Sequence, residues 1–173
     1  MLAGLLLWPP PLAAAAPSSF SSSTVRVVDG DTLVVGDARR SRRVRLAGVD
    51  APETKQLCKR GGGEWACGAA ATQALTEHLS KRSVHCVVTT GEDRYGRNVA
   101  LCDVGGADVG KWAVENGWAL AYKQYGGKVY ADAEAAARTA RRGVWSSSEF
   151  ENPWEWRKER REEAVQARVT RTP

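Results

Sequence analysis

The decapeptide VRLAGVDAPE ends an apolar strand in two acids around a proline. Pro52 forces Ala51 into an extended conformation and has no amide hydrogen, so the chain must leave the strand there and the carbonyl of Ala51 is free to point elsewhere. Asp50 and Glu53 should therefore lie at a strand end. Asp31 follows an earlier tight turn and gives a third acid of the same kind. Oxygen donors of this type suit a hard cation such as calcium.

Two arginines could act together with these acids in one site. Arg45 shares a strand face with Arg43, and Arg97 follows the segment DRYG. Guanidinium groups stay charged and bind phosphate oxygens bidentately. Together with a metal they would neutralise a pentacovalent phosphorus while a carboxylate activates or orients water, so the set predicts phosphodiester cleavage. The competing interpretation is that each acid is an ordinary turn residue and each arginine a solvated surface charge.

The elements that position these residues follow from hydrophobic periodicity. Two β-branched runs around Asp29-Gly30 predict a hairpin over 24–36, and alternation over 42–49 predicts a third strand. Residues 84–90 and 97–104 predict a second hairpin. Helices are expected over 66–82, 107–117 and 128–143. The pattern predicts the α+β class, as a five-stranded OB-fold-type β-barrel with three α-helices.

The two ends of the chain differ from the middle. Residues 1–23 are uncharged, with an apolar run followed by small residues, which is typical of a secretory signal; the alternative is a disordered leader. Residues 24–147 form the predicted domain. Residues 148–173 are an aromatic and charged tail, expected to be a solvated helix or a frayed end. We therefore expect an exported protein, periplasmic or secreted, with no stable membrane association.

Four cysteines agree with export, because they are even in number and lack the C-x-x-C spacing of zinc or thioredoxin sites. If the second hairpin folds about Arg94, Cys86 lies directly opposite Cys102, close enough to bond. The remaining pair is then Cys58 with Cys67.

The chain has 173 residues and a formal net charge of +5, which fits one domain with a polyanionic partner, although charge alone is weak evidence for nucleic acid.

Three segments in this order, VVDGDTLVV, VRLAGVDAPE and DRYGR, resemble the signatures of the staphylococcal nuclease-like (thermonuclease) family. The resemblance covers roughly residues 24–145. It implies an OB-fold barrel and a monomeric endonuclease that hydrolyses DNA and RNA with Ca²⁺ as cofactor.

Carried over by motif, the resemblance implies three groups of site residues. Asp31 and Asp50 would be calcium ligands, with Ala51 giving its carbonyl oxygen in place of the family's usual threonine. Glu53 would be the general base or would position water. The remaining residues would contact substrate: Arg45 and Arg97 at the scissile phosphate, and Tyr122 and Tyr125 by nucleotide stacking.

A binding module of the same fold, with catalysis lost, is the alternative function. Such modules lose the acid and arginine set, whereas all five side chains are present in this chain. The sequence therefore favours a catalytic nuclease.

Overall fold

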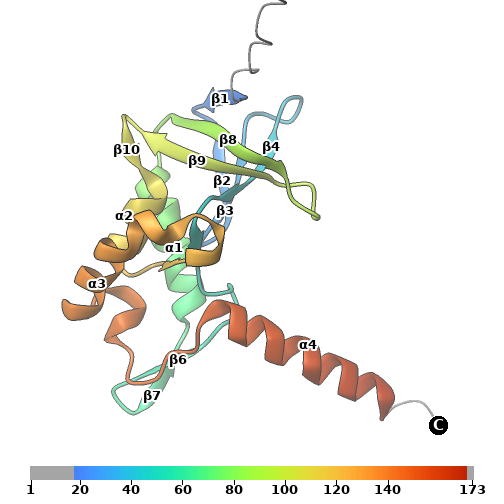
Figure 1. Ribbon diagram of the computed structural model, residues 1–173, viewed down its shortest axis with the longest axis vertical. Helices are drawn as coiled ribbons and strands as arrows, with labels where there is room; N and C mark the ends of the chain where they lie inside the picture. The colour runs from blue at the N-terminus through green and yellow to red at the C-terminus, as the bar shows by residue number, and fades with distance from the viewer. Residues whose placement is uncertain (1–17, 171–173) are drawn as a thin grey trace, which may run out of the picture.

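The computed structural model describes residues 18–170 (Figure 1). Most of the predicted leader, residues 1–17, lies outside the described residues. The part of it that is described, Ser19–Ser22, is a strand (β1) that pairs antiparallel with β8 (Val84–Glu92) at the edge of the main sheet. The ordered sheet thus begins within the segment that the composition assigned to the leader.

The main sheet has the strand order β1-β8-β9-β4-β3-β2, with β10 added beside β9. All neighbours are antiparallel except β4 and β9, which run parallel. Its remaining strands are β2 (Val25–Asp29), β3 (Thr32–Val35), β4 (Arg42–Leu46), β9 (Asn98–Val104) and β10 (Ala107–Asp108).

The sheet curls around the main core. Register shifts between Val27 and Asp29 in β2 and between Val88 and Gly91 in β8 increase the local twist. Side chains alternate along β3 and β4, which sends the apolar ones inward. Buried in this way are Leu33, Val35, Val44 and Leu46.

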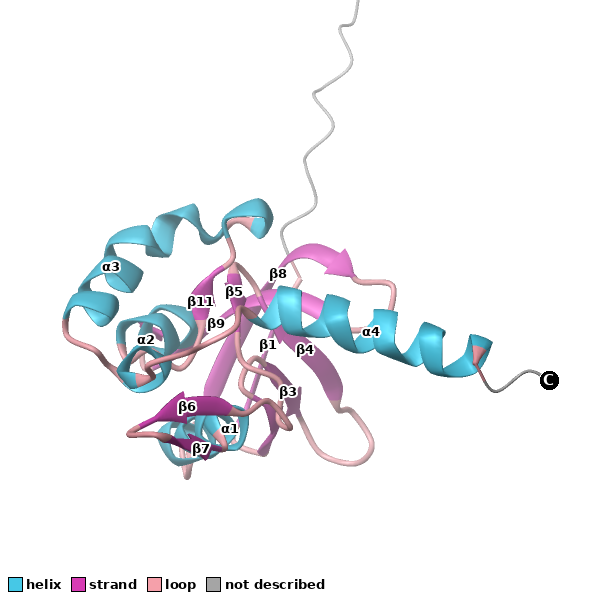
Figure 2. Ribbon diagram, turned by 90° about the horizontal axis from the view of Figure 1, so that it is seen from below, coloured by secondary structure: helices cyan, strands magenta, loops and turns pink. Residues whose placement is uncertain are grey.

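Four α-helices lie within residues 18–170: three in the domain, as predicted, and one in the tail, where a solvated helix was one of the two expectations. The first three pack in the domain, whereas the last projects away from it in both views (Figures 1 and 2). They are α1 (Cys67–Leu79), α2 (Val109–Glu115), α3 (Ala131–Thr139) and α4 (Pro153–Val169). The described part of the chain also has three short 3₁₀ turns. Two precede α3, at Lys123–Tyr125 and Gly127–Tyr130, and one lies between α3 and α4, at Gly143–Ser146. The predicted α+β class with a curled OB-type sheet is confirmed, with six strands in the sheet path instead of five.

Two small pairings complete the scaffold. Strand β5 (Val49–Asp50) pairs with β11 (Leu120–Ala121), which brings the segment after β11 next to the end of VRLAGVD. The glycine-rich loop expected over 55–68 contains a short hairpin, β6 (Cys58–Arg60) and β7 (Gly63–Trp65). Within residues 18–170, no helix has both the length and the apolarity needed to cross a membrane.

Both predicted disulfides are present. Cys86 and Cys102 lie directly opposite each other on β8 and β9, with a Cα–Cα distance of 4.1 Å. Cys58 and Cys67 join the β6–β7 hairpin to the start of α1, with a Cα–Cα distance of 5.7 Å. The hairpin register deduced from the sequence is therefore correct at this position.

We expect the Cys86→Ala/Cys102→Ala double variant to unfold more easily, because the bond closes a loop with a sequence separation of 16. The free energy of unfolding should fall by about 2–4 kcal/mol. Urea denaturation measures the change. Wild type in reductant should lose at least as much, and an unchanged unfolding midpoint in the double variant would show that this bond does not stabilise the fold.

Candidate active site

Asp31 lies in the turn between β2 and β3 and is almost fully buried. Its Oδ2 accepts the amide N–H of Ala51 at 2.8 Å, and its Oδ1 accepts the hydroxyl of Thr32 at 3.1 Å. The turn approaches Ala51 closely: a Cβ on Gly30 would lie 2.6 Å from the Cβ of Ala51. Glycine is therefore required there for the two acid-bearing strand ends to meet.

Asp50 is completely buried and faces the same guanidinium as Asp31. The Nη2 atom of Arg45 lies 2.8 Å from Asp50 Oδ1 and 3.1 Å from Asp31 Oδ2. Its Nη1 atom donates to the carbonyls of Val49 and Leu46, at 2.7 and 3.1 Å. One nitrogen thus bridges two carboxylates that come from different strand ends, while the other fixes the side chain to the backbone.

Burial makes this acid group electrostatically costly. Burial raises the pKa of Asp50, and the negative charge of Asp31 raises it further, against hydrogen bonding from Arg157 and the charge of Arg45. The pKa of Asp29, whose carboxylate accepts the amide of Asp31, is raised to about 6, first by burial and then by the charge of Asp31. Additional positive charge would therefore be stabilising here.

Arg97 is held by its own turn. Asp93 accepts the amide N–H of Arg97, and its Oδ2 lies 2.7 Å from Arg97 Nη2. The other guanidinium nitrogen donates to Thr32 Oγ1 at 3.3 Å, and Thr32 in turn donates to Asp31. Arg97 is therefore linked to Asp31 through Thr32. Thr32 and Asp93 stand inside the motifs DGDT and DRYGR but were not predicted as site residues.

Glu53 lies in the bend that follows Pro52. Its amide N–H donates to the side-chain oxygen of Gln56 at 3.2 Å, and its carbonyl accepts the amide of Gln56 at 2.7 Å. Helix α1 starts directly against this bend: a Cβ on Gly68 would lie 1.7 Å from the Glu53 carbonyl oxygen. Glycine at that position is what lets the helix fix the bend.

The tail supplies a residue that the sequence reasoning missed. Arg157, in α4, has its Nη1 atom 2.8 Å from Glu53 Oε1 and 3.0 Å from Asp50 Oδ1, and its Nη2 atom 2.7 Å from Asp50 Oδ2. Burial lowers the pKa of Arg157, but the hydrogen bonds and charges of the two acids more than reverse that effect. The one feature of the sequence that pointed to Arg157 was its place, about one helical turn after the start of the aromatic tail segment PWEW.

The two predicted stacking residues lie together, with ring centroids of Tyr122 and Tyr125 4.7 Å apart. Tyr122 also stacks on Trp154, at 5.5 Å and an interplanar angle of 3°. The β5–β11 pairing places this aromatic group beside Asp50, and burial followed by the Asp50 charge raises the pKa of Tyr122. The fold thus brings the aromatic residues to the acid group.

The candidate metal ligands are carboxylate and carbonyl oxygens, the ligand type that a hard cation such as calcium prefers. Asp31 and Asp50 converge on a single nitrogen of Arg45, the place where a positive charge is needed. Residues 18–170 contain no cluster of three or more His, Cys, Asp or Glu side chains placed to hold a metal. The predicted set has two carboxylates and a backbone carbonyl, and the coordination by Ala51 stays a prediction.

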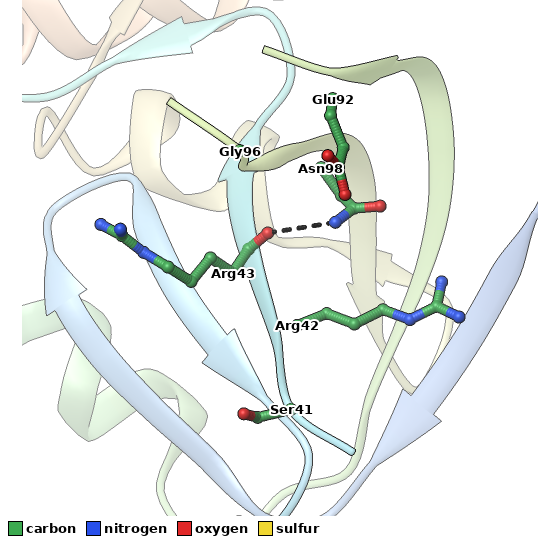
Figure 3. A pocket seen from close by; sticks show the side chains of 6 residues that line it. All are labelled: Ser41, Arg42, Arg43, Glu92, Gly96 and Asn98. Atoms are coloured by element: carbon green, nitrogen blue, oxygen red, sulfur yellow. Dashed lines mark hydrogen bonds between the residues drawn. The ribbon is translucent and has the colours of Figure 1, made fainter. Parts of the chain in front are cut away.

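An open hollow of about 510 Å³ lies beside the Arg97 turn (Figure 3). Arg43 and Arg42 point in opposite directions there, and Asn98 donates to the carbonyl of Arg43 at 3.5 Å. Glu92 is its only acid, and that residue is exposed. The hollow lacks the paired buried acids, so we place the candidate active site at Asp31 and Asp50.

Comparison with known proteins decides the family. The model of the family described as staphylococcal nuclease homologue matches residues 43–147. The chain belongs to this nuclease family. The match begins after Asp31 and ends before α4, so the contacts of Asp31 and Arg157 rest on the structure.

Individual relatives agree with the nuclease family. A protein named micrococcal nuclease from Shigella flexneri is 35% identical over 154 residues, covering 82% of this chain and 82% of that protein. An uncharacterized endonuclease of Escherichia coli O157:H7 is 36% identical over 135 residues, covering 77% and 82%. The succinoglycan biosynthesis protein ExoI of Rhizobium meliloti is 37% identical over 122 residues, covering 69% and 61%. Family membership and the first two of these names support a nuclease function.

We expect Gly68→Ala to impair the site while leaving the sheet intact, because the new methyl group would push the Glu53 bend away from α1. Turnover should fall by about a hundredfold, as misplacement of about 1 Å can do. Steady-state kinetics on a DNA substrate measures it, with circular dichroism as the fold check.

Gly63→Ala is the matched control, since a Cβ on Gly63 meets nothing within 4 Å. Equal rates for the two variants would contradict the proposed fixing of Glu53 by α1.

Proposed function

We propose that the protein is a calcium-dependent endonuclease that hydrolyses phosphodiester bonds of DNA and RNA. The observation that carries the proposal is the single nitrogen of Arg45 held between the buried carboxylates of Asp31 and Asp50. Such a group of opposite charges at a strand end has little use in a purely structural turn, because burying it costs more than apolar packing would. It is well suited to binding a cation and a phosphate side by side.

Asp31, Asp50 and the carbonyl of Ala51 are the residues that would hold calcium. When bound, calcium would supply positive charge to the scissile phosphate as a Lewis acid. The acids are preorganised for that purpose: Ala51 and Thr32 each donate a hydrogen bond to Asp31, which fixes its two oxygens.

Glu53 would accept a proton from the attacking water or orient that water. Its side chain is about one third exposed, whereas that of Asp50 is fully buried, so Glu53 is the acid that solvent can reach. The Gln56 and Gly68 contacts hold its backbone, which fixes the point from which the side chain extends.

Arg45 and Arg97 would contact the phosphate undergoing cleavage. Both are partly exposed, with side-chain accessibilities of 13% and 20%, so each can present N–H groups to a ligand. Asp93 holds the plane of Arg97, and the carbonyls of Leu46 in β4 and Val49 in β5 hold that of Arg45. Held in this way, the two planar forks are prepared for the trigonal-bipyramidal charge of the transition state.

Tyr122 and Tyr125 would stack on nucleotide bases next to the cleaved bond, which suits a substrate with unpaired bases. The two disulfides support an oxidising compartment and therefore export to the periplasm or outside the cell. We propose a monomer without stable membrane association. A catalytically inactive binding module stays the alternative function, and the next two experiments separate it from a nuclease.

Arg45→Lys should lower kcat/KM by about 10²–10³-fold, because lysine keeps the charge but cannot bridge Asp31 and Asp50 while also bonding the backbone. The rates should be measured at saturating calcium on single-stranded DNA and on RNA. Arg26→Lys is the matched control, since Arg26 is an exposed residue on β2 of the same sheet. If both variants cleave at the wild-type rate, Arg45 takes no part in the reaction.

Glu53→Gln should keep the fold and nucleotide binding but lower kcat by about 10²–10⁴-fold, the range for loss of a general base.

Chelation of calcium should abolish cleavage by wild type without removing its cooperative unfolding transition, because the apolar core forms without the acids. Rate measurements with calcium, with other divalent cations and with chelator test both statements. Undiminished cleavage in chelator would overturn the calcium dependence, and nucleic-acid binding without cleavage in any condition would support the binding module.

A further inference from the structure

Arg157 occupies the atoms that the proposed chemistry needs. It donates to both oxygens of Asp50 and to one oxygen of Glu53. Asp50 Oδ1 also accepts from Arg45. In this arrangement both oxygens of Asp50 are engaged by guanidinium groups, and one oxygen of Glu53 is bound to Arg157, so a metal ion or an attacking water would have to displace the arginine.

Trp154 occupies the aromatic part of the site in the same way. Its ring lies parallel to that of Tyr122, 5.5 Å away, which is the offset-stacked arrangement that a nucleobase would adopt on a tyrosine. The exposed Tyr125 tilts against the first tyrosine and leaves the stacking face to the tryptophan.

One helical turn carries both residues. Trp154 and Arg157 are three positions apart, so they lie on the same side of α4. The chain before them is fixed to the domain: Gln56 donates to the carbonyl of Glu151 at 2.6 Å, and Lys59 forms an ion pair with Glu149 at 2.7 Å. The turn is thus delivered to the site by a fixed segment.

The rest of α4 has few ties to the domain. Every residue from 158 to 170 is exposed, and the ion pairs of Lys158 with Glu162 and of Arg160 with Glu163 lie within the helix. Both ribbon views show the helix leaving the body of the protein (Figures 1 and 2). Movement of the helix would therefore break the stack, the arginine contacts and the packing of Trp154 on the small core cluster that contains Leu120 and Val144.

We propose that residues 153–157, the occluding turn, are an internal inhibitor of the active site, with Arg157 in the place of the cation and Trp154 in the place of a base. The inference rests on the proposed function. The site opens when a divalent cation takes the acids from Arg157 and the released guanidinium turns to solvent.

The test compares the intact protein with Arg157→Gln, which keeps hydrogen-bonding groups but removes the competing charge. Calorimetric titration with calcium, without substrate, should show about tenfold tighter binding in the variant, the factor that one charge-assisted hydrogen bond carries. The calcium concentration for half-maximal cleavage should fall by a similar factor, with kcat at saturating calcium unchanged. Arg161→Gln is the matched control, one turn further along the exposed part of α4, and should behave as wild type.

Three outcomes would overturn the inference. Equal calcium affinity in Arg157→Gln and wild type would show that Arg157 does not compete with the cation. A lower kcat at saturating calcium with unchanged affinity would make Arg157 a phosphate-binding residue. Absence of calcium binding in every variant would overturn the proposed function together with the inference. If Arg157→Gln does not fold, Arg157→Lys carries the test, because its single ammonium group cannot bridge Asp50 and Glu53, and its calcium affinity should still exceed that of wild type.

Discussion

The bridge from Arg45 to Asp31 and Asp50 is the interaction on which the other features of the site depend. Two buried carboxylates repel each other and lose their hydration, so they can stay close only beside a positive charge. The nitrogen of Arg45 provides that charge at 2.8 and 3.1 Å. The sheet in turn fixes the arginine, because Thr32 pairs with Arg45 across β3 and β4 and carries the link onward to Arg97.

The curled sheet explains why the acids meet although they are far apart in the sequence. Asp31 ends one turn, Asp50 ends another strand, and glycine at position 30 lets the two backbones approach. The surroundings of the acids have the same origin: α1 begins against Glu53, and β11 places Tyr122 next to Asp50. The candidate site residues thus lie at the ends of regular elements or in the turns and bends beside them.

Much of the fold and of the candidate site could be predicted from local sequence motifs. DGDT, VRLAGVDAPE and DRYGR each hold an acid or arginine beside the turn that orients it, and alternation gave the strand faces and the Cys86–Cys102 register. Arg157 could not be found in this way, since its contact with Asp50 spans 107 positions and depends on how the tail packs. The strand Ser19–Ser22 was missed because its uncharged, serine-rich sequence matches the composition of a leader. The roles assigned to the site residues stay predictions.

The strand Ser19–Ser22 has a consequence for the colloidal behaviour of the protein. It covers the free side of β8, and Phe20 packs on the core while the guanidinium of Arg42 lies 4.7 Å from its ring. Without β1, the nine-residue strand Val84–Glu92 would present unpaired backbone groups, a template for adding strands from other molecules. Its replacement at the sheet edge is only four residues long and rich in serine. Processing that removed residues through Ser22 would therefore produce a chain prone to edge-to-edge aggregation, whereas processing before Ser19 would leave the edge of β8 covered.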